Sequence, residues 1–336
     1  MQSIFYERAR DVNHAIALAS EPGAKFIGGG TNLLDLYKSG IEKPVRLVDV
    51  SRLSLAGIEE LPNGGLRIGA MATNTAVGTH PLVRQRYRAL SEALLNGATT
   101  QLRNMATVGG NLLQRTRCYY FTDPAFTHCN KREPGSGCDA LDGHQRIHAI
   151  LGASEHCIAT HPSDMAVALA ALDAVVHLQG PDGERQVPLV DFHRLPEDHP
   201  EIDTVIRPGE LITAVELPPM SFARESHYLK VRDRASYAFA LVSVAVALDI
   251  DSSQSGGNVR DVRIALGGVA HKPWRATEAE NVLRGQALSE ELLARAGAAA
   301  VNGAQPYPGN AFKVDLARRA VVRALQTVIR KNGGQP

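Results

Sequence analysis

The chain has 336 residues, of which 44% are hydrophobic and 21% charged, and its formal net charge at pH 7 is +1. This is the composition of an ordinary globular protein that is long enough for two or three domains. The near-neutral charge does not favour a nucleic-acid or anionic-membrane partner, and no apolar run approaches the roughly 20 residues of a bilayer-spanning helix.

The amino-terminal segment contains acidic residues and lacks a basic start followed by a small-residue cleavage pattern, so we predict no signal peptide. Export would then require a partner that carries its own signal. Four cysteines in so long a chain are too few for a disulfide framework.

The first part of the chain mixes strand and helix patterns. The elements expected here are, in chain order, a strand at 3–6, a helix at 11–20 capped by Asp11, strands at 24–27 and 45–51, a hairpin turn at 62–65 and a helix at 81–95. After a segment that bears the cysteines, we expect a helix at 163–174 capped by Ser163, a hairpin at 174–192 and a strand at 210–219.

The remainder of the chain, from about residue 220, is predicted to form a second domain. The expected elements are a strand and a long buried apolar element within 226–250, a turn at 251–258, a strand at 262–270, and helices at 289–301 and 312–329. Strands and helices follow one another without a strict βαβ rhythm, which favours an α+β fold over a doubly wound sheet. The predicted domains are therefore 1–219 and 220–336.

Two glycine-rich segments stand out, KFIGGGTNLL at 25–34 and ATVGGNLLQ at 106–114. Consecutive glycines let the backbone approach a ligand closely, and successive N–H groups in such turns suit a pyrophosphate. Leu33 stands where the third glycine of G-x-G-x-x-G belongs, which disfavours an NAD-type Rossmann site. Either loop alone is better interpreted as a tight turn, but the two together favour phosphate binding.

Five segments, in this order and spacing, resemble the FAD-binding medium subunit of the xanthine dehydrogenase (molybdenum hydroxylase) family: KFIGGGTNLLDL, GAMATNT, ATVGGNLLQ, HPSDM and YLKVRDRASYAFALVSVAVAL. The similarity covers nearly the whole chain. It implies an α+β protein in which a vanillyl-alcohol-oxidase-type (PCMH-type) FAD-binding module of two subdomains is followed by a small α+β C-terminal domain.

The resemblance also implies contacts with FAD. The residues that it places around the pyrophosphate and adenosine are Lys25, Phe26, Ile27, Gly28, Gly29, Gly30, Thr31, Asn32 and Leu33. Those that it places along the flavin and in the second loop are Ala98, Leu102, Ala106, Thr107, Gly110, Asn111 and Leu113, and those near the ribityl chain and isoalloxazine are Ser163, Asp164, Ile212 and Lys230. Ser163 and Asp164 also suit a helix start, and Lys230 also suits an exposed strand, but the resemblance favours ligand contact.

All four cysteines fall in one insertion at about 115–160, between the second glycine loop and Ser163: Cys118, Cys129, Cys138 and Cys157. A loop of this length needs something to organise it. Four thiolates suit a [4Fe–4S] cluster, a [2Fe–2S] cluster or Zn²⁺, and the absence of a C-x₂-C pair leaves the choice open. Because histidines lie nearby, a mixed Cys/His metal site is a further alternative, and two disulfides are another. Inert free thiols are disfavoured, because such cysteines are normally buried in apolar surroundings and these lie among charged residues.

A branch of the family, which includes 4-hydroxybenzoyl-CoA reductase and periplasmic aldehyde oxidoreductase, carries a four-cysteine insertion here that binds [4Fe–4S], and CNKREPGSGC looks most like the aldehyde oxidoreductase type. The resemblance therefore implies an electron-transfer subunit with FAD and a [4Fe–4S] cluster bound by the four cysteines, and no catalytic residue of its own. It would take electrons from a small [2Fe–2S] subunit and pass them to an external acceptor, while a large molybdenum-cofactor subunit oxidises an aldehyde. Such a heterotrimer would be periplasmic by co-export or cytoplasmic. The alternatives are the medium subunit of another molybdenum hydroxylase, a free-standing FAD oxidase, and a zinc-stapled nucleotide-binding module.

Overall fold

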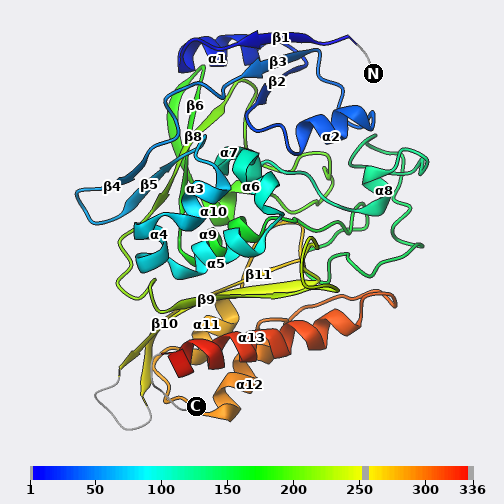
Figure 1. Cartoon of the computed structure of the whole chain (residues 1–336). Helices are drawn as coiled ribbons and strands as arrows, with labels where there is room; N and C mark the ends of the chain where they lie inside the picture. Colours follow the sequence, from blue (N-terminus) through cyan, green and yellow to red (C-terminus); the bar gives the residue numbers. More distant parts are fainter. Residues whose placement is uncertain (1–2, 252–256, 332–336) are drawn as a thin grey trace.

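The structure is a computed structural model that describes residues 3–251 and 257–331. Its amino-terminal part is a sheet of three parallel strands in the order β1–β3–β2 (Figure 1). The elements of this part are β1 (Phe5–Arg8), α1 (Val12–Ala19), β2 (Ala24–Ile27), α2 (Leu33–Lys38) and β3 (Arg46–Asp49). The predicted cap of α1 is confirmed, since Asp11 accepts a hydrogen bond from the backbone N–H of His14 at 2.8 Å. The strand expected at 3–6 begins two residues later.

A second sheet of five antiparallel strands has the order β4–β5–β8–β6–β7. Its strands are β4 (Ile58–Glu60), β5 (Leu66–Gly69), β6 (Val175–Gly180), β7 (Gly183–Pro188) and β8 (Leu211–Leu217). Both predicted hairpins are confirmed, because β4 pairs with β5 and β6 pairs with β7. The two sheets belong to the part of the chain for which two subdomains are expected.

Short helices pack beside the five-stranded sheet. They are α3 (Asn74–Thr79), α4 (Pro81–Arg86), α5 (Arg88–Asn96), α6 (Thr100–Met105), α7 (Val108–Leu112), α9 (Asp164–Ala171) and α10 (Leu189–Phe192). The prediction of one helix at 81–95 is wrong, because the backbone leaves the helical region at Tyr87 (φ −132°). The ring of Tyr87 is buried and its hydroxyl donates to the carbonyl oxygen of Pro218 at 3.0 Å, which ties the break to the core.

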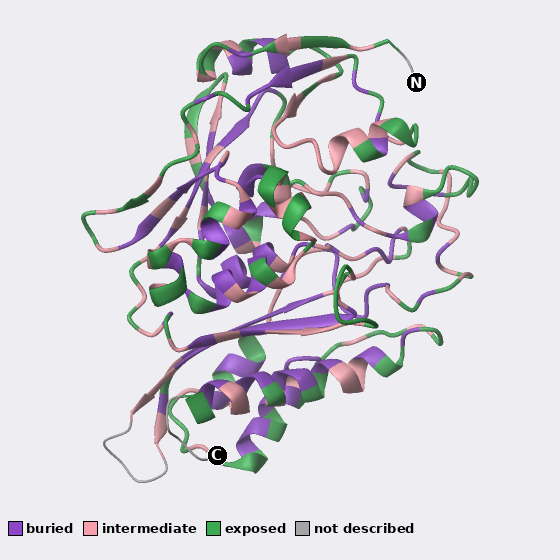
Figure 2. Ribbon diagram, in the orientation of Figure 1, coloured by how far each residue is buried: buried purple, intermediate pink, exposed green. Residues whose placement is uncertain are grey.

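The carboxy-terminal part contains a four-stranded antiparallel sheet in the order β12–β11–β10–β9. Its elements are β9 (Ser226–Val231), β10 (Val242–Asp251), β11 (Asn258–Gly267), β12 (Trp274–Arg275), α11 (Thr277–Leu283), α12 (Glu290–Ala299) and α13 (Phe312–Lys331). Helices α11 and α13 pack on one face, with α12 packed against these two helices, while the other face contacts α5 and α9 (Figure 1). Because both faces are covered, β10 is buried from Val242 to Leu248 (Figure 2), and Ser243 is the one polar side chain in that stretch. Most of the turn expected at 251–258 lies outside the described residues.

The insertion lies at the side of the molecule as an irregular segment (Figure 1). Between residues 115 and 160, all of them described, the only helix is α8 (Tyr119–Thr122). Arg132 organises this segment, because its guanidinium donates to the carbonyl oxygens of Tyr120, Phe121, Asp123 and Phe126. The expected α+β class is confirmed. Within the described ranges, no helix is both long and apolar enough to cross a membrane.

Candidate functional site

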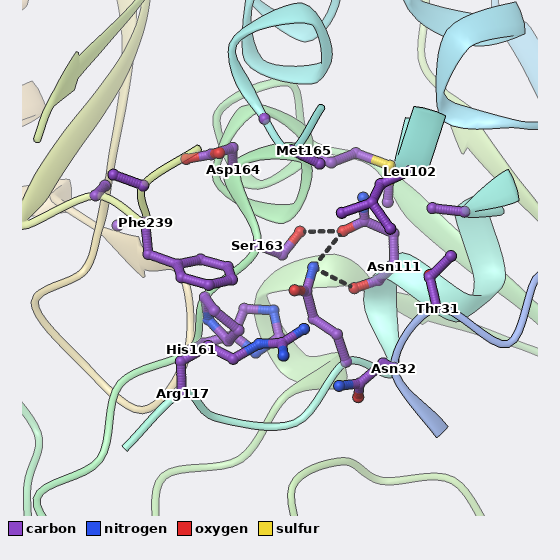
Figure 3. Close-up of a pocket in the computed structure, with 18 of the residues that line it drawn as sticks. Thr31, Asn32, Leu102, Asn111, Arg117, His161, Ser163, Asp164, Met165 and Phe239 are labelled. Atoms are coloured by element: carbon purple, nitrogen blue, oxygen red, sulfur yellow. Dashed lines mark hydrogen bonds between the residues drawn. The ribbon is translucent and has the colours of Figure 1, made fainter. Parts of the chain in front are cut away.

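A pocket of about 900 Å³ opens between the first glycine loop, the helical layer and the connection from β9 to β10 (Figure 3). Twelve of the residues predicted to bind FAD line it: Gly29, Gly30, Thr31, Asn32, Ala98, Leu102, Ala106, Gly110, Asn111, Ser163, Asp164 and Lys230. The volume is within the usual range for cofactor and small-molecule sites. The pocket thus brings together residues from four distant parts of the sequence.

The two glycine loops touch each other, and this contact explains Gly28 and Gly29 of the first loop. A Cβ atom on Gly29 would lie 1.8 Å from the carbonyl oxygen of Met105, and one on Gly28 would lie 3.1 Å from Oγ1 of Thr107. Gly30 has φ +70°, a conformation that glycine adopts without steric cost. The loops therefore form one continuous backbone wall at the entrance to α2 and α7.

Side-chain hydrogen bonds join the second loop to α9 (Figure 3). Ser163 Oγ donates to Oδ1 of Asn111 at 2.6 Å and accepts from the N–H of Ala166 at 2.9 Å. Gln114 Nε2 donates to the same Asn111 oxygen at 2.7 Å. Ser163 therefore caps α9 and lines the pocket at the same time, so the local interpretation and the ligand-contact prediction are compatible.

Asp164 and Lys230 form a buried ion pair in the pocket wall. Nζ of Lys230 lies 2.7 Å from Oδ2 of Asp164, and the hydroxyl of Tyr228 donates to Oδ1 at 2.5 Å. The Lys230 side chain is only 4% exposed, so the alternative of an exposed strand charge is wrong. Burial raises the pKa of Asp164, while Lys230 opposes that rise. Whether Lys230 contacts FAD stays a prediction.

The remaining predicted cofactor residues lie outside the pocket lining: Lys25, Phe26, Ile27, Gly28, Leu33, Thr107, Leu113 and Ile212. Several of them shape the pocket indirectly. Thr107 caps α7 by accepting from the N–H of Gly110 at 3.2 Å, Lys25 pairs with Glu42 at 3.0 Å, and Ile212 is buried. Leu113 is 41% exposed. Their roles as direct FAD ligands stay predictions.

Sequence reasoning missed Arg117, which lines the pocket and directly precedes Cys118. Its guanidinium lies over the ring of Phe239 at 5.0 Å from the centroid (Figure 3). Burial lowers its pKa. The sequence offers little signal for this role, because Arg115, two positions earlier, is the same residue type but pairs with Glu42 and Asp203 instead of lining the pocket.

The four cysteines come together around one apolar cluster formed with Leu36, Tyr120, Phe121, Ala140, Ile158 and Ala159. Cys118, Cys129 and Cys157 are buried and Cys138 is half-buried, and all four are free thiols in the described structure. Cys129 and Cys138 face each other across a short antiparallel bridge. The charged sequence around them does not surround the sulfur atoms, since Lys131 and Arg132 point to carbonyl oxygens elsewhere.

Hydrogen-bond donors surround the sulfur atoms. Backbone N–H groups of Tyr120 and Phe121 interact with the Cys118 thiol, and Ala159 donates to Cys157 Sγ at 3.5 Å. Burial raises the pKa of Cys118 to about 12 and that of Cys157 to about 11. The Cys118 and Cys157 thiols are therefore protonated at neutral pH, and bound iron or zinc would be needed to convert them to thiolates.

The described residues show no preformed site for a metal ion. Four thiolates around one Zn²⁺ must converge to about 2.3 Å from a common point. Among the described residues, no group of three or more His, Cys, Asp and Glu side chains is placed to hold a metal ion. The donor set of four cysteines with N–H groups at their sulfurs agrees with the chemistry of an iron–sulfur site, whose thiolates are spread around several irons.

A buried chain of charges connects the insertion to the first glycine loop. Lys131, between two of the cysteines, forms an ion pair with Asp203, and Arg115 contacts Asp203 at 2.6 Å and Glu42 at 2.5 Å. The neighbouring cations hold the pKa of Asp203 far below its usual range despite burial. The insertion is therefore anchored to the rest of the protein by compensated charges as well as by apolar packing.

Comparison with known families agrees with this geometry. The family described as FAD binding domain in molybdopterin dehydrogenase matches residues 2–220, and the family described as CO dehydrogenase flavoprotein C-terminal domain matches residues 227–328.

Individual proteins are similar over nearly the full chain. The aldehyde oxidoreductase FAD-binding subunit PaoB of Escherichia coli (strain K12) is 52% identical, over 97% of this chain and 98% of its own length. The glyceraldehyde dehydrogenase medium chain of Sulfolobus acidocaldarius is 25% identical, over 95% of this chain and 94% of its own.

Two solved structures have the same overall fold. They are quinoline 2-oxidoreductase from Pseudomonas putida 86 (25% identity) and carbon monoxide dehydrogenase from Hydrogenophaga pseudoflava (27% identity), each with a TM-score of 0.74 and 97% coverage of both chains. The expected fold, an FAD-binding module of the PCMH type followed by a small α+β domain, is thereby confirmed.

Proposed function

Because the chain belongs to the family of FAD-binding medium subunits of molybdenum hydroxylases, we propose that it is the FAD- and [4Fe–4S]-containing electron-transfer subunit of a molybdenum-dependent aldehyde oxidoreductase. Its family membership makes it a component of an oxidoreductase. The aldehyde specificity is supported by the high identity to a subunit whose name states that activity. In this proposal the domains are 1–219, which includes the insertion, and 220–336.

The chain's own residues bind and orient the cofactors. FAD and an iron–sulfur cluster, when bound, supply the electron-transfer chemistry that amino-acid side chains lack. The glycine loops present backbone N–H groups, Asn111 and Ser163 fix the second loop on α9, and the Asp164–Lys230 pair stiffens the opposite wall. No described side chain has to act as a general acid or base in this function.

The observation that carries the cluster proposal is the gathering of all four cysteines in one small apolar cluster. An apolar surrounding, several N–H donors at sulfur and irregular backbone are the features by which proteins hold and tune iron–sulfur clusters. The ligands in this proposal are Cys118, Cys129, Cys138 and Cys157. The insertion lies close to the pocket, because Arg117 lines the pocket while its neighbour Cys118 faces the other cysteines.

The molybdenum cofactor and the [2Fe–2S] clusters are assigned to a large and a small partner subunit in this proposal. The solved relatives named above are quinoline 2-oxidoreductase and carbon monoxide dehydrogenase, and the present chain covers 97% of one chain of each. Aldehyde oxidation itself would take place in the large subunit. Co-expression with both partners is therefore the natural state in which to test the chain.

The test is the metal and flavin content of the chain purified from that complex. We expect one FAD and about four iron atoms per chain, with flavin absorption bands above a broad iron–thiolate shoulder. Cys138→Ser should lose most of the iron of this chain and keep the FAD. Thr127→Ser, a conservative change at an exposed site of the same insertion, should keep both. Zinc in place of iron, or unchanged iron in Cys138→Ser, would contradict the proposal.

A further inference from the structure

Arg117 is a half-buried cation at the boundary between the pocket and the cysteine cluster. It lies on the connection between α7 and α8, and its side chain extends into the pocket beside His161 and Phe239 (Figure 3). Nε of Arg117 is buried without a hydrogen-bond partner among the described residues. Among those residues, the guanidinium also has no ion pair.

Arg115 shows what a compensated arginine looks like in the same segment. Its guanidinium contacts the carboxylates of Glu42 and Asp203, and these raise its pKa although it is buried. Arg117 has no such partners: it forms no ion pair among the described residues, and the acidic side chain that acts on it, Asp35, is exposed. Desolvating a guanidinium without an anion beside it is costly, so its position is best explained by an anionic group that is missing from the protein itself.

The other charged side chains of the lining do not meet this need. Lys230 and Asp164 neutralise each other, and Asp233 pairs with Arg146 at 2.5 Å. Arg234, Lys38 and Asp35 are exposed. His161 is held neutral, because burial lowers its pKa far below the usual value. Arg117 therefore contributes a half-buried positive charge that has no ion-pair partner within the described lining.

A second unpaired donor lies in the same pocket. Nδ2 of Asn32, at the end of the first glycine loop, is buried without a partner among the described residues. The side-chain oxygen of Asn32 accepts from the backbone N–H of Arg115 at 3.0 Å, which holds the amide in place. Phe239 covers the Arg117 guanidinium and thereby restricts its orientation. Two fixed donors without acceptors call for an oxygen-rich, negatively charged ligand group.

We propose that Arg117 binds the diphosphate of FAD, together with Asn32 and the backbone of the first glycine loop. The diphosphate is the anionic part of this cofactor, and a planar guanidinium binds phosphate oxygens through paired N–H donors. The inference rests on FAD binding, which the family assignment shows, and it is independent of the cluster proposal. It also makes residues 117 and 118 a direct backbone link between the FAD site and the cysteine cluster.

The experiment compares ligands that share parts of FAD. The full chain, freed of flavin, is titrated with FAD, with ADP as a probe of the diphosphate half, and with riboflavin as a probe of the flavin half. In Arg117→Gln, the dissociation constants for FAD and ADP should rise about ten- to hundredfold, the usual effect of losing a charge-assisted hydrogen bond. Riboflavin binding should stay within twofold of the wild type. Arg117→Lys should recover part of the ADP affinity, because it keeps the charge.

Arg318→Gln, which removes an exposed arginine from α13, is the control for the substitution and should bind all three ligands normally. Unchanged ADP affinity in Arg117→Gln would overturn the inference, and so would an equal loss of riboflavin and ADP affinity. If the wild-type chain itself took up no FAD, the family-based FAD site would be wrong. If the wild type binds FAD and Arg117→Gln binds FAD and ADP equally well, the FAD site stands and only the proposed role of Arg117 is wrong.

Discussion

Nε2 of His148 lies 3.1 Å from Sγ of Cys118 in the interior of the protein. The backbone carbonyl of His148 accepts hydrogen bonds from Nζ of Lys313 at 2.7 Å and from Nδ2 of Asn310 at 3.3 Å. Both donors lie at the start of α13 or just before it, so the C-terminal domain holds the residue that contacts a proposed cluster ligand. The other ring nitrogen of His148 has no hydrogen-bond partner among the described residues.

The first prediction concerns His148→Phe. A hydrogen bond to a ligating sulfur stabilises the reduced, more negative state of an iron–sulfur cluster. Removing the donor should therefore shift the midpoint potential of the cluster to a more negative value while the iron content stays the same. A redox titration followed by electron paramagnetic resonance measures the shift. His144→Phe, at an exposed position of the same insertion, should leave the potential unchanged; equal potentials in all three proteins would contradict the role of His148.

The second prediction concerns the contact between the glycine loops. In Gly29→Ala, the new Cβ would meet the backbone oxygen of Met105 at 1.8 Å, so the loops must separate. We expect most of the FAD to be lost on purification and the free energy of unfolding to fall by about 2 kcal/mol or more. Flavin absorbance and urea unfolding measure the two effects.

Gly40→Ala is the matched control for Gly29→Ala. Gly40 has φ +73°, and no atom lies within 4 Å of the place that a Cβ would take, so alanine there meets backbone strain of about 1–2 kcal/mol and no clash. That variant should retain its FAD. Retention of FAD by Gly29→Ala as well would mean that the contact between the loops does not shape the pocket.

The third prediction concerns the buried pair of Asp164 and Lys230. Lys230→Met leaves the Asp164 carboxylate buried with Tyr228 as its remaining side-chain donor, which should lower the free energy of unfolding by about 3–5 kcal/mol. The double variant Asp164→Asn/Lys230→Met removes both charges and should lose less stability than the single Lys230 variant. Urea unfolding of the flavin-free chain measures both. A double variant that loses more stability than Lys230→Met alone would contradict the role of the ion pair.

The fourth prediction is a pH dependence that comes from Lys313. Its side chain is fully buried and donates to two backbone carbonyls, and burial lowers its pKa from 10.5 to about 7. Between about pH 7 and 10.5 the unfolded chain binds a proton at this lysine that the folded chain does not. The contribution of Lys313 to stability therefore rises with pH across this window, by at most about 1.4 kcal/mol per pH unit.

Lys313→Met removes this titration. The difference in the free energy of unfolding, wild type minus variant, should increase from pH 7 to pH 9.5, as measured by urea unfolding at each pH. Other titrating groups are the same in both proteins and cancel in the difference. Parallel pH profiles would show that Lys313 keeps an ordinary pKa.

Local sequence signals were sufficient wherever the cause was local. Asp11 and Ser163 cap the helices that they were predicted to cap, and the two hairpin turns form, because a cap or a turn depends on residues within a few positions of each other. The prediction failed at Tyr87, where a side chain buried against Pro218 interrupts a helical pattern that has no local breaker.

The sequence by itself determined that two glycine loops and four clustered cysteines exist in an α+β chain, and the family resemblance supplied their meaning. Only the tertiary structure decided which charges are compensated. Arg115 and Arg117 are the same residue type two positions apart, yet one forms ion pairs with two carboxylates from distant segments and the other forms no ion pair among the described residues. Burial and charge pairing arise from segments far apart in the chain, so no local pattern contains them, and they become visible when the fold brings those segments together.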